Sequence, residues 1–362
     1  MVTRVHGRRG ARQQRSGKRE RLAHVCYSAG MLPVVRVLRG FVRHELRILA
    51  YHRVLEVVDP EAFEFDLELI SASPEQFREQ MQLVKKRMYP LRFEDVLASI
   101  DSGKALPANA IVVTFDDGYD DNYHAALPIL KDLGMPATFF VSTGHIDSGL
   151  PYAYDWLVHM ICVTAETRLD LPEVDLRCVL PAARALRREI AADLLDRMKW
   201  LDDARQSALI ARLEREWKMP RVVHPTCRPM TWGQVREMQA AGMELGSHGV
   251  GHRMLTKLSA EETRAEVFDS KQALERELGR AVDVLSYPVG GADAYNNKVI
   301  DAANTAGYRL ACNYITGTNP LPLSNPFALH RLRVESHLSM ASFAGMISWP
   351  EVFGYGTRGR IG

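Results

Sequence analysis

The sequence predicts a mixed α/β fold in which parallel strands and helices alternate around a barrel. Seven short apolar segments have the length and composition of buried strands, and helical patterns separate most of them. Polar residues follow several of these strands, as they do on the face of a (β/α) barrel where active sites form. The predicted strands are residues 47–52, 111–116, 137–142, 243–248, 283–287, 308–313 and 327–333. A doubly wound open sheet is the alternative.

Length and composition are those of a globular protein. The 362 residues allow one large barrel or two smaller domains, and the hydrophobic share of 46% is ordinary. The net charge of +2 gives no reason to expect a nucleic-acid partner. The 5 cysteines form no CxxC pair, which argues against a disulfide framework and a thiolate zinc site.

No apolar run approaches the roughly 18–20 residues of a membrane helix, so we expect no transmembrane segment. A cytoplasmic location is the resulting expectation, with a periplasmic or membrane-peripheral location as the alternatives.

Two segments stand apart from the alternating pattern. Residues 1–30 form a basic tail, with eight Lys and Arg and a single acid between residues 3 and 22, and we expect it to be disordered. A contact with a surface or a nucleic acid is the alternative. Residues 151–225 carry helical patterns without a convincing strand, which predicts a helical insertion. The barrel therefore occupies residues 31–362 and is interrupted by that insertion.

The helices between the strands are predicted from apolar residues at helical spacing and from start and stop signals. Pro74 lies near the start of one helix, Gly134 ends another, and Ser259 with Glu262 forms a capping box. In chain order the predicted helices are residues 33–45, 74–88, 93–100, 122–134, 231–242, 259–279 and 296–307.

The stretch VTFDDGYDDN (residues 113–122) places four carboxylates directly after a buried strand. Burying Asp116 and Asp117 side by side costs free energy unless something offsets their repulsion. A metal ion and a solvated turn are the two candidates. Asp120 and Asp121 fit the amino end of the following helix, where acidic side chains are favoured.

Two histidines follow a later strand at HxxxH spacing, in the stretch GSHGVGH. His248 and His252 with one carboxylate make a suitable divalent-metal site, and three protein ligands leave a position open for water. If Asp117 is the third ligand, its charge is neutralised and Asp116 is free to act as a general base. A catalytic zinc lowers the pKa of its water to about 7. Two ordinary surface or core histidines are the alternative.

The motifs TFDDGYDD, SHGVGH and SYPVGG, in this order, resemble those of the polysaccharide deacetylases of carbohydrate esterase family 4, which share the nodulation-factor deacetylase homology region. LAYHRV (residues 49–54) resembles the opening strand of a subgroup associated with exopolysaccharide synthesis. The resemblance covers roughly residues 47–335. It implies a distorted (β/α)7 barrel, Zn²⁺ or a similar divalent ion, and removal of acetyl groups from N-acetylated sugars.

The resemblance assigns roles by motif position. Asp116 would be the general base, Asp117, His248 and His252 the metal ligands, and the backbone N–H of Val289 an oxyanion donor. His330 approximately matches the motif that supplies the general acid.

Two positions depart from the family pattern. Gly249 stands where a Ser or Thr often steadies the histidine loop, so that support must come from elsewhere. Ser286 stands where an Arg often orients the base, which leaves open how Asp116 is held.

His52, Tyr287 and Trp156 are assigned to substrate binding. His52 ends the first strand beside the expected site, and Trp156 offers an aromatic face of the kind that suits a sugar ring. The alternatives are a hydrogen-bonded histidine at a strand end and a tryptophan in the core.

These observations predict a metal-dependent N-deacetylase that hydrolyses the acetamide of N-acetylhexosamine units and releases acetate. The expected partner is an N-acetylated glycan or glycolipid. A hydrolase of small non-peptide amides such as allantoin, on the same barrel, is one alternative. A non-catalytic glycan-binding protein is the other.

Overall fold

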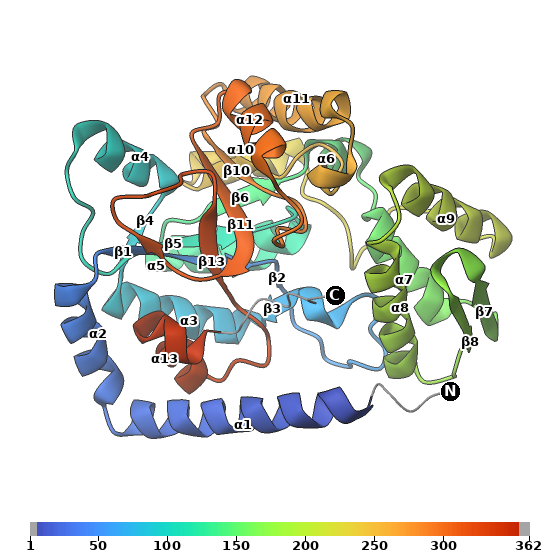
Figure 1. Cartoon of the computed structure of the whole chain (residues 1–362), viewed down its shortest axis with the longest axis horizontal. Coiled ribbons are helices and arrows are strands. Elements are labelled where there is room, and N and C mark those ends of the chain that lie inside the picture. Colours follow the sequence, from blue (N-terminus) through green and yellow to red (C-terminus); the bar gives the residue numbers. More distant parts are fainter. Residues whose placement is uncertain (1–5, 355–362) are drawn as a thin grey trace.

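A computed structural model describes residues 6–354, with side chains from residue 17 onward. Seven parallel strands form a closed barrel that helices surround (Figure 1). In spatial order these are β1 (Glu45–Tyr51), β13 (Leu329–Arg333), β11 (Leu310–Thr316), β10 (Val284–Ser286), β9 (Glu244–Ser247), β6 (Thr138–Val141) and β5 (Ala110–Phe115). The pairing of β1 with β5, from Arg47 opposite Ile111 to Tyr51 opposite Phe115, closes the ring. This closure confirms the predicted barrel and excludes the open sheet.

The barrel is irregular, as the resemblance implied. Strands β9 and β10 are joined through a single residue pair, Leu285 opposite Ser247, and the register between β11 and β13 shifts between Cys312 and Thr316. Besides the hairpin of the insertion described below, four short strands lie outside the closed ring and were not predicted, because two or three residues are too few to show a period. They are β2 (Arg53–Val54), β3 (Ile70–Ala72), β4 (Tyr89–Leu91) and β12 (Asn319–Pro320).

Six of the outer helices begin and end near residues that the sequence predicts, and three short ones, at residues 143–148, 340–348 and 350–353, were not predicted. Ser73, Thr231 and Ser259 cap three of the predicted helices, each with a side-chain oxygen that accepts a backbone N–H in a capping box. The helices are α3 (Pro74–Arg87), α4 (Phe93–Ser102), α5 (Leu127–Leu133), α6 (Thr143–Ser148), α10 (Trp232–Ala240), α11 (Ala260–Leu278), α12 (Asn297–Thr305), α13 (Met340–Ser348) and α14 (Pro350–Phe353).

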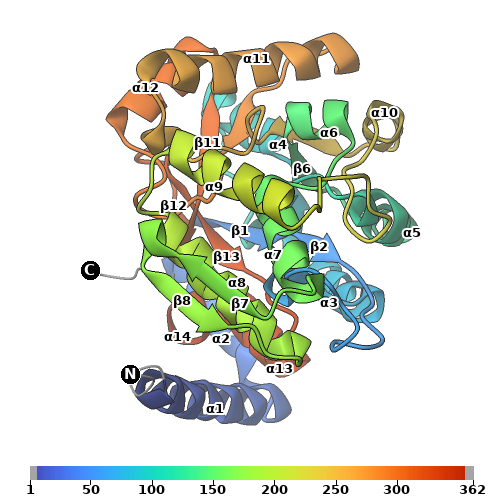
Figure 2. The same cartoon turned by 90° about the vertical axis from the view of Figure 1, so that its right-hand side faces the viewer.

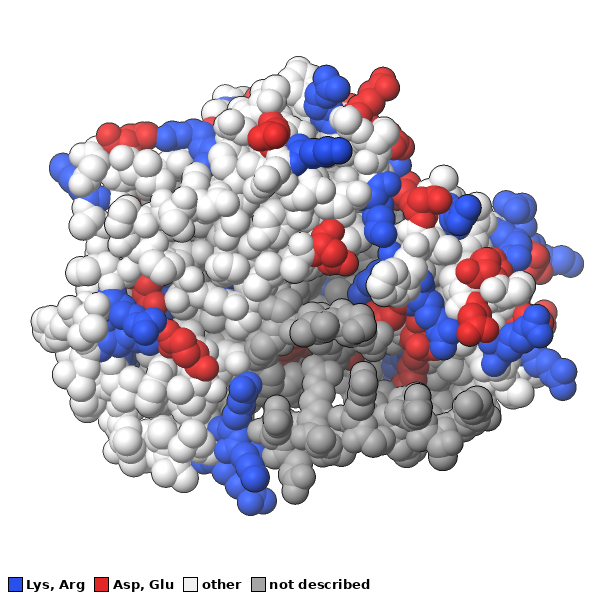
Figure 3. Space-filling model, in the orientation of Figure 1, with Lys and Arg blue, Asp and Glu red and all other residues white. Residues whose placement is uncertain are grey.

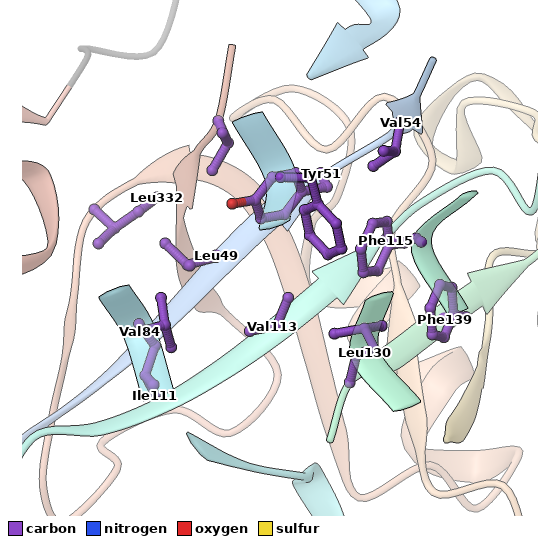
Figure 4. Close-up of a cluster of buried hydrophobic side chains, with 14 of the residues drawn as sticks. Leu49, Tyr51, Val54, Val84, Ile111, Val113, Phe115, Leu130, Phe139 and Leu332 are labelled. Atoms are coloured by element: carbon purple, nitrogen blue, oxygen red, sulfur yellow. The ribbon is translucent and has the colours of Figure 1, made fainter. Parts of the chain in front are cut away.

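The main core lies between the barrel and its outer helices (Figure 4). Leu49, Val113 and Phe139 point outward from their strands and pack in one cluster with Val84 of α3 and Leu130 of α5. Alternate residues point into the barrel, where a second cluster fills its interior toward the amino ends of the strands. Members of this inner cluster include Leu46, Ile48, Ala110, Val112, Phe140, Val284, Leu310 and Leu329.

The insertion between β6 and β9 has a hydrophobic core of its own and lies beside the barrel (Figure 1). Its elements are α7 (Ala153–Val163), β7 (Arg168–Leu171), β8 (Leu176–Val179), α8 (Arg184–Met198) and α9 (Asp203–Glu216). The prediction of a purely helical insertion is wrong, because β7 and β8 form an antiparallel hairpin (Figure 2). Each of these strands has four residues, so its alternation was too short to stand out between two long helices.

The amino-terminal segment is helical in two pieces, α1 (His6–Ser28) and α2 (Met31–Val42). The prediction of a disordered tail is wrong at least for residues 17–28, where Ala23 and Cys26 are buried in the main core. The prediction rested on charge and overlooked this short apolar face. No single helix among residues 17–354 is long and apolar enough to cross a membrane. Residues 17–28 and 31–42 have the length and composition of a span only as a pair, which is bent by 90°.

Candidate active site

The polar residues singled out in the sequence come together at the carboxyl ends of the barrel strands. Asp116 and Asp117 follow β5, His248 follows β9 and His52 follows β1. The inner apolar cluster fills the opposite end of the barrel, so its carboxyl end is left for polar side chains. Asp116, Asp117 and His248 are all buried, so each of these polar side chains needs a hydrogen-bond or ionic partner.

Asp117, His248 and His252 form a group with the donor set of a divalent metal site. Oδ1 of Asp117 lies 3.4 Å from Nε2 of His248 and 3.1 Å from Nε2 of His252. Among the described residues this buried oxygen has no hydrogen-bond partner. A carboxylate oxygen that faces two imidazole nitrogens without a hydrogen bond fits a shared cation, because one carboxylate and two imidazoles are ligands that zinc accepts.

The backbone and the hydrogen bonds around this group support the same interpretation. Asp117 and His252 have φ angles of 73° and 55°, in the left-handed region that costs non-glycine residues free energy and is common at functional sites. Nδ1 of His248 lies 2.7 Å from the backbone oxygen of Ser286. A proton on Nδ1 makes that bond and leaves the lone pair of Nε2 for a metal.

Glu266 of α11 supports the loop that carries the two histidines. Its Oε2 accepts the backbone N–H of Val250 at 2.8 Å and that of Gly251 at 3.0 Å. Gly249 has a φ of 76°, and a Cβ there would lie 2.9 Å from the same Oε2. A larger residue at position 249 would therefore be strained and would displace the carboxylate of Glu266, and the support that a Ser or Thr often gives comes from that carboxylate of another element.

Arg331 of β13 holds the predicted base. Its two terminal nitrogens lie 2.7 Å from the two oxygens of Asp116, and one of them donates to Oγ of Ser286 at 3.0 Å. Its Nε donates to the backbone oxygen of Asn313 at 2.7 Å. Burial would raise the pKa of Asp116, but Arg331 and then His248 outweigh it, so the pKa lies below its usual value. Asp116 is therefore a carboxylate, as a general base must be.

The sequence reasoning missed Arg331, although a signal was present. An arginine in the middle of an apolar strand is expensive to bury and needs a partner of opposite charge. Ser286, which occupies the position where the family often has its Arg, is small enough to leave room for the Arg331 side chain and bonds to it.

His330 does not reach the site, and its prediction as the general acid is wrong. Successive side chains of a strand point to opposite faces, and Arg331 points into the barrel. His330 therefore faces outward, where its Cβ lies 3.1 Å from the Cβ position of Gly317. Its backbone N–H and carbonyl are both bonded to the side chain of Asn319.

His52 lies in the site. Its backbone N–H donates to Oγ of Ser71 at 2.9 Å, its carbonyl accepts from Asn122 at 2.8 Å, and its Nδ1 lies 3.3 Å from the hydroxyl of Tyr314. Burial lowers the pKa of His52, and the nearby carboxylates of Asp117 and Asp116 oppose that shift. His52 is thus a titratable side chain close to the base and the metal-ligand group.

Val289 lies in the turn after β10 with a φ of 66°, a conformation that a β-branched residue rarely adopts. The preceding Pro288 lies 3.7 Å from the Cβ position of Gly249, so this turn borders the histidine loop. The backbone of Val289 is therefore near the site, as the oxyanion role requires.

Tyr287 and Trp156 are core residues, and their prediction as substrate contacts is wrong. Tyr287 is fully buried, stacks on Tyr295 at 4.9 Å between ring centroids, and donates to the backbone oxygen of Phe327 at 3.0 Å. Trp156 is buried in the core of the insertion and donates to the backbone oxygen of Met219 at 3.0 Å.

Two tyrosines of the same stretch approach the site instead. The ring centroids of Tyr152 and Tyr154 lie 5.0 Å and 5.2 Å from that of His252. The hydroxyl of Tyr152 also donates to the backbone oxygen of Asp117 at 2.8 Å. The aromatic residues that approach the site thus come from the start of α7, a few residues before Trp156.

Asp120 and Asp121 lie at the amino end of the helix that follows the strand, as expected, but their side chains are buried and form ion pairs. Asp121 pairs with Nε of Arg53 at 2.8 Å and accepts the N–H of Val54 at 3.0 Å. Asp120 pairs with Arg228 at 2.5 Å. The two ion pairs anchor the strand end to the neighbouring segments, whereas the first two aspartates of the motif face the site.

Glu64, His159 and His224 form a second group of metal-binding residue types, at the contact between barrel and insertion. Oε2 of Glu64 lies 3.4 Å from Nδ1 of His159 and 3.8 Å from Nε2 of His224. The backbone N–H of Thr226 donates to Nδ1 of His224 at 3.2 Å, however. A neutral imidazole that accepts at Nδ1 carries its proton on Nε2, which then has no lone pair for a metal. This group is therefore a polar contact between the barrel and the insertion and not a metal site.

Comparison with known proteins agrees with this geometry. Residues 103–311, more than half of the chain, match the family model described as polysaccharide deacetylase. YxkH of Bacillus subtilis (strain 168) is 24% identical over 243 residues, which are 66% of this chain and 56% of YxkH, so the chain spans just over half the length of that relative.

One further relative is similar in sequence, and another protein is similar in its solved structure. The poly-β-1,6-N-acetyl-D-glucosamine N-deacetylase of Escherichia coli (strain K12) is 33% identical over 75 residues, 20% of this chain and 11% of that protein. The structure of the Streptococcus pyogenes deacetylase PplD in complex with acetate aligns with 82% of this chain and 95% of its own, at 22% identity and a TM-score of 0.55. Together with the match of the family model, the barrel and the site geometry place this chain in the polysaccharide deacetylase family.

Proposed function

We propose that the protein is a metal-dependent N-deacetylase that hydrolyses the acetamide of N-acetylhexosamine units in a glycan or glycolipid. One observation carries the proposal: Asp117, His248 and His252 lie close together beside a carboxylate, Asp116, that Arg331 of β13 holds. Membership of the family supports the reaction class. The relative named as a poly-β-1,6-N-acetyl-D-glucosamine N-deacetylase supports the sugar.

Asp117, His248 and His252 would hold the ion, and zinc suits this donor set best because two imidazoles and a carboxylate are its common ligands. When bound, a divalent ion supplies Lewis-acid chemistry: it polarises a carbonyl and lowers the pKa of water.

The other side chains of the site divide the remaining work. Asp116 accepts the proton of the attacking water, and Arg331 orients its carboxylate. Water adds to the carbonyl carbon of the acetamide, and the backbone N–H of Val289 stabilises the oxyanion. His52 takes the acid role that His330 cannot fill, and donates a proton to the leaving amine as the carbon–nitrogen bond breaks. Acetate and the free amine are the products.

The geometry removes the main reason for the non-catalytic alternative. That alternative rested on the absent Arg and the absent Ser or Thr. Arg331 and Glu266 supply both functions from other elements, so the base is held and the histidine loop is supported.

The test is acetate release by the purified full chain from oligomers of N-acetylglucosamine, with β-1,4 and β-1,6 linkages, and from allantoin. A chelator is added, and zinc is then restored. The proposal expects acetate from at least one sugar oligomer, loss of activity with the chelator, and recovery with zinc. Hydrolysis of allantoin without acetate release would move the substrate to small amides, and acetate release that survives complete removal of metal would contradict the mechanism.

A further inference from the structure

Helix α2 exposes its apolar face and turns its basic face toward the rest of the protein. A helix that only packs against its own protein has the opposite orientation. Its exposed residues are Met31, Val34, Val37, Leu38, Phe41 and Val42. At 3.6 residues per turn these positions form one stripe along the helix. A stripe of six large apolar side chains facing away from the protein is more than scattered surface residues explain.

The arginines of α2 lie on the opposite side and are used within the protein. Arg39 donates to the carboxylate of Glu45 at 2.8 Å and 2.9 Å and to Glu351 at 2.5 Å. Arg36 donates to the backbone oxygen of Arg87. The polar face of this helix is therefore already satisfied by the barrel and by α14, and the apolar face is left outside.

The amino-terminal part of the sequence is rich in positive charge. Residues 1–43 contain eleven Lys and Arg and one Glu, whereas the whole chain has a net charge of +2. The rest of the chain is consequently acidic. The described outer side of α1 carries Lys18 and Arg21 together with the exposed Leu22 and Val25. Figure 3 shows few charged side chains along the edge formed by α2, at the lower left, and mixed charges over the insertion.

We propose that the outer faces of α1 and α2 bind an anionic lipid surface, with the apolar stripe of α2 in the headgroup region. Binding of this kind combines buried apolar area with the attraction of basic residues to acidic lipids. A nucleic acid would use the charge and leave the apolar stripe exposed. A second copy of this chain would cover the stripe and bring two strongly basic segments together, which is unfavourable.

The location of this face leaves the active site free. Helix α2 directly precedes the amino end of β1, and the site lies at the carboxyl ends of the barrel strands. If the proposed function is correct, which this last step assumes, the substrate at such a surface is a glycan carried by a lipid. The lipid-binding proposal itself does not depend on the reaction.

The experiment measures co-sedimentation of the full chain with vesicles of phosphatidylcholine alone and of phosphatidylcholine mixed with phosphatidylglycerol. The wild type should bind the mixed vesicles, and added salt should weaken that binding. Phe41→Glu and Val42→Glu alter side chains that are 79% and 81% exposed, so the fold should persist, and binding should fall roughly tenfold or more. Val58→Glu is the matched control, since Val58 is 91% exposed outside these helices and its change should leave binding intact.

Three results would overturn the proposal. The first is that the wild type binds neither kind of vesicle. The second is that Val58→Glu weakens binding as much as Phe41→Glu does. The third is that the wild type binds no vesicle and instead forms a dimer that Phe41→Glu dissociates. Acetate release from a soluble sugar oligomer, measured on the same variants, should not change. Loss of lipid binding with normal acetate release, or lipid binding without any acetate release, separates failure of one proposal from failure of the other.

Discussion

Arg331 and His330 are neighbours, and the face of β13 on which each side chain lies decides its role. The inward Arg331 meets the carboxylate of Asp116, whereas the outward His330 packs beside Gly317. A motif match that is one residue out of register selects the wrong face of a strand. Sequence alone located the candidate base and the three metal-ligand candidates, because adjacent carboxylates and an HxxxH pair are visible locally. It also placed His52 beside the site, but it did not find Arg331, since the contact of Arg331 with Asp116 depends on how the strands are arranged in the closed barrel.

Replacing Arg331 by Lys should change the pH profile and not only the rate. Lysine keeps the charge but cannot hold both carboxylate oxygens, so the pKa of Asp116 should rise from its lowered value. The base works only when deprotonated, and the acidic limb of kcat/KM should therefore move to higher pH. We expect kcat at neutral pH to fall roughly tenfold or more. Arg333→Lys, on the same face of the same strand, is the control, and an unchanged acidic limb in Arg331→Lys would contradict the role of Arg331.

The two histidines that compete for the acid role can be separated directly. His52→Gln removes the proton donor beside the carboxylates and should lower kcat by about 10²-fold or more, with metal content retained. His330→Gln changes a side chain on the outer face and should leave kcat within about twofold, because general-acid effects need contact with the substrate. Equal activity of the two variants would remove His52 from the mechanism, and a large loss only in His330→Gln would restore the motif assignment.

Elements are positioned by partners that no local pattern reveals. The seven barrel strands were predicted because each is a run of apolar residues, but β2, β3 and the β7–β8 hairpin were not, because they are short and paired only with each other. The histidine loop between β9 and α11 is similar: its shape depends on Glu266, which lies 17 residues after Gly249 in the sequence and in a different element. The family often has Ser or Thr at this position, and this chain uses glycine because the carboxylate fills the space.

Gly249→Ser, which introduces a residue common in the family, should therefore damage this protein. The substitution places a Cβ 2.9 Å from Glu266 Oε2 on a backbone with φ of 76°. Strain of this kind costs of order 1–3 kcal/mol, and the displaced carboxylate would release the N–H groups of Val250 and Gly251. Thermal unfolding should show a lower Tm, and zinc affinity should fall because His248 and His252 lose their fixed spacing. Gly233→Ser, at an open position in α10, is the control, and a variant as stable as wild type would contradict the support role of Glu266.

At the scale of the whole molecule, the metal group joins strands that do not pair with each other. Asp117 follows β5 and His248 follows β9, and β6 lies between them in the ring. An ion at this place would connect two parts of the barrel that are more than a hundred residues apart in the sequence, on both sides of the insertion. The insertion has its own core, so its folding does not require that ion. The second group, Glu64, His159 and His224, holds the insertion against the barrel through polar contacts and does not need a metal ion.

Metal removal should accordingly destabilise the whole chain through one site. Zinc bound to the native state alone stabilises it by mass action, about 4 kcal/mol at a thousandfold excess over Kd, so a chelator should lower Tm by roughly 5 °C. Purified protein should contain one equivalent of zinc per chain. His252→Gln should lose both the zinc and the response of Tm to the chelator. His224→Gln should keep both, because its Nδ1 accepts from Thr226 and its Nε2 offers no lone pair. A second equivalent of zinc that disappears in His224→Gln would show that the tautomer argument fails and that the ion also holds the insertion to the barrel.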